Sequence, residues 1–341
     1  MEKNLDIRKS LFYVASLLFA FSIIYFLFRN QDPVELLKKI SEVQFEWVIL
    51  SMIFGAIAYV NRGLRWIVLI DALEYESSKI NSISSVSIGY FTNLFIPRAG
   101  EISRCTALSR CEKIPVEKLF GTILIERVID IIFLSILFLL ILGLKFDMII
   151  NFLFELNSHT NSNSSTSIYI LFMMIVIGIS FLIFKRKIKK TDFYSKILNF
   201  LDGLNEGFKS IRKIKRKKSF WIHTFSIWIM YFLMTYVCFH AIPETSQLTM
   251  TDGLFLLVLG GLGMVIPTPG GIGSYHAIVM IGLSVLGVGT VFLGENGSPS
   301  NPALIFPTIV HAAQTLVAII MGSVGLLILI IANKKRYNEE S

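Results

Sequence analysis

The chain of 341 residues is 54% hydrophobic and 16% charged, and its formal net charge is +8. This composition excludes both a soluble globular domain and a disordered chain, and it predicts an all-α protein that crosses a membrane several times. Basic residues beside hydrophobic segments commonly set membrane topology and contact anionic lipid, so we do not expect nucleic acid as a partner.

Three full spans and one interrupted segment are expected in the first half of the chain, residues 1–150. The spans are predicted at 11–28, 47–70 and 116–144. A short amphipathic connection at 31–44 follows the first span. The segment after the second span contains Pro97, which favours two half-helices over one continuous helix. We expect these half-helices at 80–95 and 101–112, forming a re-entrant hairpin over 80–112.

The second half, residues 151–341, repeats this order of elements. Its full spans are predicted at 168–184, 220–240 and 303–332. An exposed polar loop is expected at 145–167, before the span at 168–184. The basic segment 185–218 is predicted to form an amphipathic helix on the cytoplasmic leaflet. A second re-entrant hairpin is expected over 253–291, with half-helices at 253–266 and 274–290.

The distribution of Lys and Arg predicts one orientation for these elements. Both termini and segment 185–218 are expected in the cytoplasm, with the loops 145–167, 242–252 and 293–302 outside. Only Lys38 and Lys39 in the connection 29–44 fit this orientation poorly. Six full spans and two hairpins that enter from opposite sides form an inverted-topology repeat. The predicted location is the bacterial cytoplasmic membrane.

The two interruptions share a short pattern of residues. NLFIPRAGEISR at 93–104 and the stretch IPTPGGIGSYH at 266–276 align at Ile, Pro, Gly and Ile with one constant offset. A match this short recurs by chance, but its position in both halves makes it informative. Non-helical backbone at membrane depth is tolerated where it is buried in protein or lines a wet cavity.

The interruptions also supply candidate residues for binding an anion such as phosphate. A helix N-terminus presents free N–H groups and a positive dipole end, and arginine forks suit phosphate oxygens. The alternative is a pair of tight turns with interfacial arginines. The candidates are Arg98, Gly100, Glu101, Arg104, Pro267, Pro269, Gly270, Gly271, Gly273 and Ser274.

Charged residues inside the third span form a second candidate group. Glu126 and Asp130 share one helix face, with Arg127 beside them. Ionisable side chains inside a membrane are costly unless paired, so they are expected to face the protein interior. They either take part in transport or form an ion-pair cluster that holds the first hairpin through Arg98 or Arg104. The two interpretations are compatible.

Other polar residues are weaker candidates. Arg62 and Arg65 share a face near the end of the second span, and with Trp66 they read as a membrane-surface group that contacts lipid. His311 and Gln314 share a face of the last span and could complete a polar cavity with His276, although a satisfied buried histidine is the simpler interpretation. The three cysteines and the other residues show no metal or cofactor signature, so we predict neither.

Three ordered stretches, NLFIPRAGEISRC, GTILIERVIDIIF and IPTPGGIGSYHA, resemble the lysylphosphatidylglycerol synthase transmembrane-region family, also called flippase-like domain proteins. NRGLRW in the second span is similar to that family as well. The resemblance implies a polytopic inner-membrane protein linked to moving lipids or lipid-linked headgroups between leaflets. Where many relatives carry Glu after the second Gly-rich turn, this chain has His276.

These observations predict a translocator that moves an anionic phospholipid or lipid-linked headgroup by alternating access, and not an enzyme. No nucleophile–base pair and no HExxH, GxSxG or P-loop signature is present in the sequence. One alternative is a membrane-embedded transferase that modifies a lipid. Another is an accessory subunit without transport, partnered by a lipid- or glycan-modifying enzyme.

Overall fold

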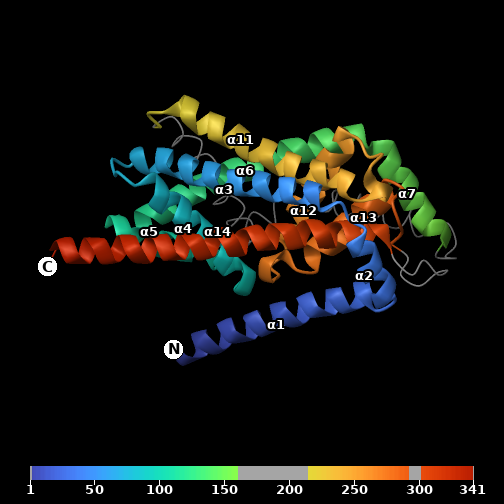
Figure 1. Ribbon diagram of the computed structural model, residues 1–341, viewed down its shortest axis with the longest axis horizontal. Helices are drawn as coiled ribbons and strands as arrows, with labels where there is room; N and C mark the ends of the chain where they lie inside the picture. Colours follow the sequence, from blue (N-terminus) through green and yellow to red (C-terminus); the bar gives the residue numbers. More distant parts are fainter. Residues whose placement is uncertain (1, 160–213, 292–300, 341) are drawn as a thin grey trace, which may run out of the picture. The chain divides into compact units, whose positions relative to one another are not determined.

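The computed structural model describes residues 2–159, 214–291 and 301–340, and within these ranges the chain is helical without strands (Figure 1). The all-α prediction is therefore confirmed for the described residues. The helices are α1 Glu2–Phe28, α2 Pro33–Ser41, α3 Phe45–Asp71, α4 Lys79–Phe95, α5 Gly100–Glu112, α6 Val116–Leu144, α7 Phe146–His159, α11 Lys217–Tyr236, η1 Val237–Ala241, η2 Pro243–Thr245, α12 Met250–Val265, η3 Pro269–Gly271, α13 Ser274–Val285 and α14 Pro302–Glu340.

Four described helices are long and apolar enough to cross a membrane. They are Phe45–Asp71, Val116–Leu144, Lys217–Ala241 and Pro302–Arg336. A fifth candidate combines the end of α1 with α2, which are bent by 89°. The span expected at 168–184 and residues 185–213 of the expected basic segment 185–218 lie outside the described residues, whereas α11 begins at Lys217. Six spans and the inverted repeat therefore remain predictions.

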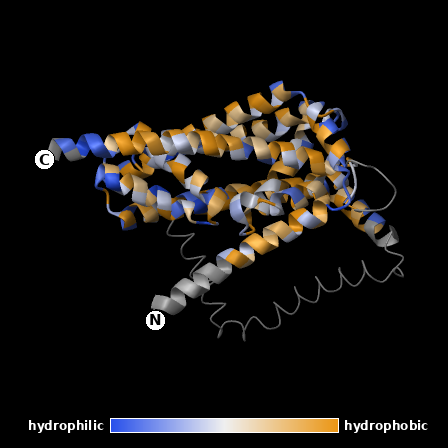
Figure 2. Cartoon of the chain, turned by 60° about the horizontal axis from the view of Figure 1, so that its bottom comes forward, coloured by the Kyte–Doolittle hydropathy of each residue, from blue (hydrophilic) through white to orange (hydrophobic). Residues whose placement is uncertain are grey.

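The surface of these helices is the surface of a membrane protein. Figure 2 shows hydrophobic colouring along their lengths and a hydrophilic C-terminal end of α14. Large apolar side chains are exposed on several helices, among them Phe19, Ile49, Leu124, Ile229 and Leu327. Lipid tails solvate such side chains, whereas water does not. The chain is a multi-pass membrane protein.

The chain divides into two compact units, Met1–Phe138 with Ile214–Ser341, and Leu139–Lys213. The second unit contains α7, which corrects the polar loop expected at 145–167. The first part of that segment is helical because large apolar residues recur along it, from Phe146 to Leu156, before the polar run begins. The expected boundary between two repeats at residue 150 stays a prediction.

The first hairpin, α4 and α5, bends at residues 96–99, which we call the first break. Ile96 ends α4 with extended backbone (φ −122°, ψ 111°), as expected for a residue before proline. Arg98 follows with a positive φ of 62°, which is uncommon for a residue with a side chain. Asn93 accepts a hydrogen bond from the Gly100 amide at 2.7 Å and so caps the start of α5.

The second hairpin consists of α12, η3 and α13, and residues 266–273 form the second break. Ile266, which precedes Pro267, is again extended (φ −66°, ψ 128°). Gly270, Gly271 and Gly273 have φ values of 59°, 81° and 81°, which only glycine adopts without strain. The expected half-helices are thus confirmed in both hairpins, although α13 ends at Val285, earlier than predicted.

The aligned glycines of the two breaks have different roles. Gly100 is the first residue of α5, whereas Gly270 lies inside the turn and α13 begins only at Ser274. The shared pattern therefore predicts where each helix ends but not how the next one starts.

The two breaks lie against each other. Arg98 Nη2 donates a hydrogen bond to the Val265 carbonyl at 3.2 Å, across 167 residues of sequence. A Cβ built on Gly270 would lie 3.2 Å from Leu94 Cδ2, so the glycine permits this approach. Figure 1 shows α14 running alongside α4, and its Gly325 allows close contact with the backbone of Ser84.

Lys39 has a partner that the positive-inside analysis did not include. Its Nζ lies 3.0 Å from Glu244 Oε1, so α2 is tied to η2 in the segment 242–252. Acidic residues contribute little to the positive-inside rule, so this pair fixes α2 in place but does not change the orientation that Lys and Arg predict.

Candidate functional site

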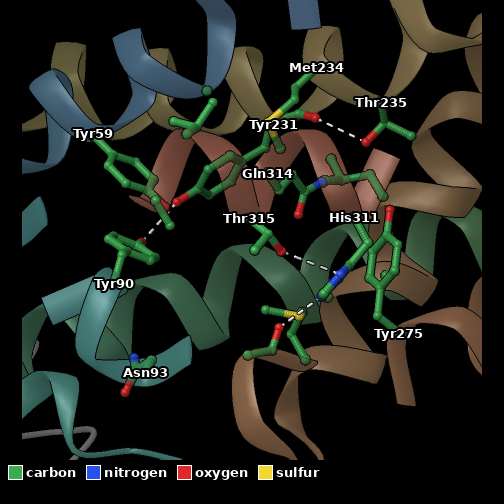
Figure 3. Close-up of a pocket in the computed structure, with 18 of the residues that line it drawn as sticks. Tyr59, Tyr90, Asn93, Tyr231, Met234, Thr235, Tyr275, His311, Gln314 and Thr315 are labelled. Atoms are coloured by element: carbon green, nitrogen blue, oxygen red, sulfur yellow. Dashed lines mark hydrogen bonds between the residues drawn. The ribbon is translucent and has the colours of Figure 1, made fainter. Parts of the chain in front are cut away.

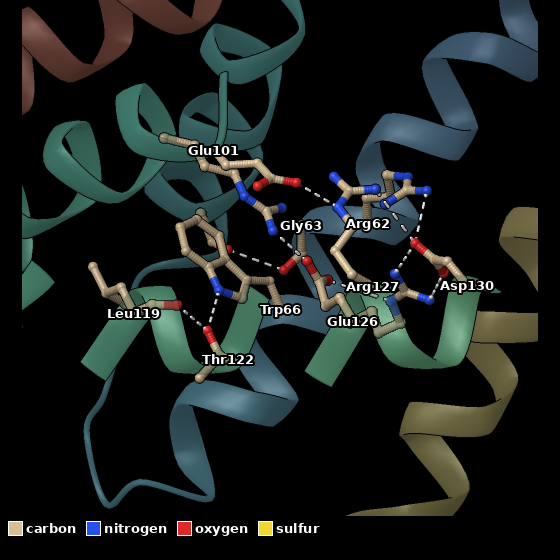
Figure 4. Close-up of polar contacts among 12 residues, drawn as sticks. Arg62, Gly63, Trp66, Glu101, Leu119, Thr122, Glu126, Arg127 and Asp130 are labelled. Atoms are coloured by element: carbon tan, nitrogen blue, oxygen red, sulfur yellow. Dashed lines mark hydrogen bonds and ion pairs between the residues drawn. The ribbon is translucent and has the colours of Figure 1, made fainter. Parts of the chain in front are cut away.

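A buried charged network joins α3, α5 and α6 in the first unit (Figure 4). Asp130 binds both arginines of α3, at 2.8 Å from Arg65 Nη1 and 3.1 Å from Arg62 Nη2. Glu126 accepts from Arg104 Nη2 at 2.5 Å and from Arg65 Nε at 3.4 Å. The carboxylates of one helix thus hold two neighbouring helices at once.

The structure corrects the position expected for Arg62, Arg65 and Trp66. Their exposed fractions are 5%, 0% and 0%, so none of them lies at the membrane surface. Trp66 Nε1 donates to Thr122 at 2.7 Å, and the Arg104 guanidinium lies 4.8 Å from the Trp66 ring centroid. The reason is charge pairing. A buried carboxylate is costly unless a cation pairs with it, and the buried arginines supply that cation to Glu126 and Asp130.

Positive charge exceeds negative charge in this network. Arg127 Nε binds Glu101 at 2.7 Å, and Arg127 Nη1 lies 3.8 Å from Asp130. The described members are four arginines and three carboxylates: Arg62, Arg65, Arg104, Arg127, Glu101, Glu126 and Asp130. Two buried guanidinium nitrogens, Arg62 Nη1 and Arg104 Nε, have no hydrogen-bond partner. The network therefore presents net positive charge.

A layer of tyrosines lies next to Arg62. Its Nε donates to Tyr231 Oη at 2.6 Å, and its guanidinium lies over the rings of Tyr231 and Tyr90, at 5.6 and 5.8 Å. The hydroxyls of Tyr90 and Tyr231 are 3.2 Å apart. Tyr59 stacks on Tyr90 with ring centroids 4.2 Å apart. These contacts place the tyrosines between the charged network and the interior space described next.

That space is a cavity of about 300 Å³ lined by parts of both hairpins and by the helices around them (Figure 3). It is lined by Gly55 and Tyr59 of α3, Tyr90, Asn93 and Leu94 of α4, Leu134 of α6, Trp228, Tyr231, Met234 and Thr235 of α11, Leu256, Leu257, Gly260, Gly261 and Met264 of α12, Gly270, Tyr275, and His311, Gln314, Thr315, Val317 and Ala318 of α14. Both hairpins thus contribute to one cavity.

His311 fixes the second break to α14. Its Nε2 lies 2.9 Å from the Gly270 carbonyl and its Nδ1 lies 3.5 Å from Thr315 Oγ1. A ring that donates through Nε2 and accepts at Nδ1 satisfies both contacts as a neutral imidazole. The His276 ring packs 4.9 Å from His311, and its Nδ1 is buried without a partner. His311 is thus a cavity residue, whereas His276 lies behind it.

The structure divides the residues predicted from the sequence into three places. Glu101, Arg104, Glu126, Arg127 and Asp130 belong to the charged network. Gly270, His311 and Gln314 line the cavity. The remaining ones, Arg98, Gly100, Pro267, Pro269, Gly271, Gly273, Ser274 and His276, form or adjoin the breaks without lining it.

The expected headgroup site of Arg98 and Arg104 with the turn at 267–274 is therefore not assembled as one group. Arg104 points into the network toward Glu126, while exposed Arg98 lies at the contact of the two breaks. Ser274 Oγ is satisfied within its own turn, 2.8 Å from Thr268 Oγ1 and 3.2 Å from the Gly271 carbonyl.

The sequence analysis missed the aromatic wall of the cavity. Tyr59, Tyr90, Trp228 and Tyr231 are scattered over three helices of an aromatic-rich chain, so no local spacing distinguishes them.

The sequence does contain a pattern from which the ion pairs of the charged network could have been predicted. Two arginines three residues apart in one span match two carboxylates four residues apart in another, and buried charges require partners.

Comparison with known proteins gives the family of this chain. The profile of the lysylphosphatidylglycerol synthase transmembrane region matches residues 13–322. A UPF0104 membrane protein of Methanocaldococcus jannaschii is 21% identical over 338 residues, covering 94% of this chain and 95% of the relative. A UPF0104 membrane protein of Methanothermobacter thermautotrophicus is 24% identical over 289 residues, covering 76% and 78%. No solved structure matches the chain. The chain belongs to the lysylphosphatidylglycerol synthase transmembrane-region family.

Proposed function

We propose that the protein moves an anionic phospholipid or lipid-linked headgroup between membrane leaflets. The observation that carries this proposal is a cavity that the described residues form where two interrupted hairpins from distant parts of the chain meet. Interrupted helices around a central site are a recurrent feature of transporters that work by alternating access. The family supports a role in lipid metabolism in general, and the cavity supports transport in particular.

In this mechanism Arg98 receives the phosphate of the headgroup. One guanidinium nitrogen is used by the Val265 carbonyl, and the side chain is otherwise exposed where the two breaks meet. An arginine can hold a phosphate through two parallel hydrogen bonds. The polar part of the headgroup then occupies the cavity while the acyl chains remain in the bilayer. Movement of one hairpin against the other exposes the cavity to each side in turn.

The charged network has a structural part in this mechanism. Arg104 of α5 and the two arginines of α3 share the carboxylates of α6, so the first hairpin is tied to two full-length helices. By contrast, the described contacts between the hairpins include one hydrogen bond of Arg98 and packing around Gly270. The contact between the two hairpins is therefore the place where one of them can shift against the other.

A liposome assay with purified full-length protein tests the proposal. Fluorescent phosphatidylglycerol is incorporated into both leaflets, and a membrane-impermeant reductant reports the lipid that reaches the outer leaflet. We expect protein-dependent exposure of the lipid, with Arg98→Ala lowering the rate about tenfold, the effect of losing one charge-assisted contact. Arg110→Ala removes an exposed arginine of α5 away from the breaks and serves as the matched control.

Two results would contradict the proposal. Liposomes with protein could show no more exposure than empty liposomes, or Arg98→Ala could transport as fast as Arg110→Ala. Appearance of a chemically altered lipid in the same vesicles would instead indicate an enzyme.

A further inference from the structure

The chemistry of the cavity lining is unusual for a site that receives an anionic lipid. None of the described residues that line it is Asp, Glu, Lys or Arg. The polar groups that remain are neutral: the hydroxyls of tyrosine and threonine, the amides of Asn93 and Gln314, and the His311 ring. Figure 3 shows these groups arranged around one space. A site with this lining recognises its ligand through neutral hydrogen bonds and not through ion pairs.

Aromatic side chains surround the same space. Tyr59, Tyr90, Trp228, Tyr231 and Tyr275 all line it and come from four different elements. The face of an aromatic ring carries partial negative charge, and C–H bonds that point at it are attracted weakly. Saturated rings that carry many hydroxyls present such C–H bonds on their faces and O–H groups at their edges. The aromatic faces and neutral polar groups of the cavity complement both features.

One donor in the cavity wall has no partner within the protein. Trp228 Nε1 is buried and makes no hydrogen bond, although its ring is held firmly by stacking on Phe133, with centroids 5.8 Å apart. This nitrogen is closed off within the wall and is not open to the cavity, so Trp228 contributes its aromatic ring to the lining and not its N–H group.

The charge behind the cavity opposes a cationic headgroup. Aromatic walls can hold an ammonium group by cation–π contact, but here Arg62 lies directly behind Tyr90 and Tyr231 and belongs to a network with excess positive charge. No carboxylate among the described lining residues offsets it. An amine-bearing headgroup would be repelled, whereas an uncharged one would not.

We infer that the cavity takes an uncharged, polyhydroxylated ring, a sugar or cyclitol that is joined to its lipid through phosphate. The inference rests on the proposed function and names the headgroup class of the same site. The cavity volume of about 300 Å³ is at the lower end of ligand pockets, roughly 300–1,000 Å³, and so suits one small ring. The phosphate remains at Arg98, outside the uncharged lining.

The test measures lipid retention by the full-length protein in detergent, from an equimolar mixture of phosphatidylinositol, phosphatidylglycerol, phosphatidylserine and phosphatidylethanolamine with identical acyl chains. Native mass spectrometry counts each retained lipid. The first three carry the same net charge, so differences among them report the headgroup. We expect phosphatidylinositol to be retained at least about fivefold over each of the others, the effect of one additional hydrogen bond.

Trp228→Leu tests the cavity itself, because it removes an aromatic ring from the lining and keeps an apolar side chain. The matched control is Trp221→Leu, since Trp221 also lies on α11 and packs near Phe133, at 6.3 Å, but does not line the cavity. We expect the preference for phosphatidylinositol to fall about fivefold in the Trp228 variant and to be unchanged in the control. Equal thermal stability of the two variants excludes a folding defect.

Retention without preference, preference for another lipid, no retention, or equal effects of the two tryptophan variants would each overturn the inference. These outcomes are distinct from failure of the proposed function. Transport of phosphatidylglycerol without a preference for phosphatidylinositol would remove only the headgroup assignment. A clear preference in binding without transport would remove only the translocator.

Discussion

At the scale of single residues, charge pairing decides where the arginines of α3 lie. A pair of arginines near the end of a span is usually placed at the membrane surface, and the sequence analysis followed that rule. The structure buries both because Glu126 and Asp130 of α6 lie opposite them. The carboxylates were correctly expected to face the protein interior, but sequence alone did not identify the helix that supplies their partners.

Removal of the Glu126 charge is therefore expected to destabilise the protein strongly. Glu126→Gln leaves Arg104 buried without the carboxylate that it pairs with, while Arg65 keeps Asp130. The loss of one partner of a buried ion pair costs about 3–5 kcal/mol. Thermal unfolding in detergent measures the change.

Glu101→Gln provides the matched control for that substitution. The Glu101 side chain is 33% exposed and that of its partner Arg127 is 39% exposed, so this pair is much less buried than that of Glu126 and its loss should cost less stability. Equal losses of stability in the two variants would contradict the central position given to Glu126.

At the scale of elements, both helix interruptions were predictable. Proline removes a backbone donor and forces the preceding residue into extended backbone, and this occurs at Ile96 and Ile266 alike. Helix α7 was not predicted because the polar run that follows it in the sequence led us to assign the whole segment to a loop. The angles at which α5 and α13 leave their breaks depend on packing between helices, which no local pattern records.

Close packing of the first hairpin depends on Gly100. A Cβ at this position would overlap the carbonyl of Gly89 in α4 and the amide of Asn93. Backbone cannot move away as a flexible side chain can, so Gly100→Ala is expected to cost about 1–3 kcal/mol and to lower the unfolding temperature.

Gly121→Ala in α6 is the control for this packing argument. A Cβ built there meets no atom within 4 Å, and alanine favours helix over glycine by up to about 1 kcal/mol. This variant should be as stable as the parent or slightly more stable. Loss of stability in Gly121→Ala, or none in Gly100→Ala, would contradict the argument that the contact between α4 and α5 decides the effect of these substitutions.

At the scale of the whole molecule, the sequence predicted the membrane class, most helix boundaries and the presence of two interruptions. It predicted a polar cavity that His311 and Gln314 could complete, but not the rest of the lining, which combines residues from α3, α4, α6, α11, α12 and α14 with Gly270 and Tyr275 of the second break and α13. Such a site depends on which helices lie side by side. Hydrophobic periodicity describes each helix separately and does not contain that information.

The central claim is that the two breaks touch at a transport cavity, and an engineered disulfide tests it most directly. A Cβ built on Gly270 lies 3.5 Å from Leu94 Cα. The two Cα atoms are therefore close enough for the separation of roughly 4.4–6.8 Å that is found in disulfides. The double variant Leu94→Cys with Gly270→Cys is made in a background in which the three buried native cysteines are alanine. The pair Gly121→Cys with Gly270→Cys is the control.

We expect mild oxidation to link positions 94 and 270 within one chain, to stop lipid exposure in liposomes, and to leave the control pair unlinked. Reduction of the disulfide should restore transport. Failure of residues 94 and 270 to link, or full transport by the linked protein, would contradict the account.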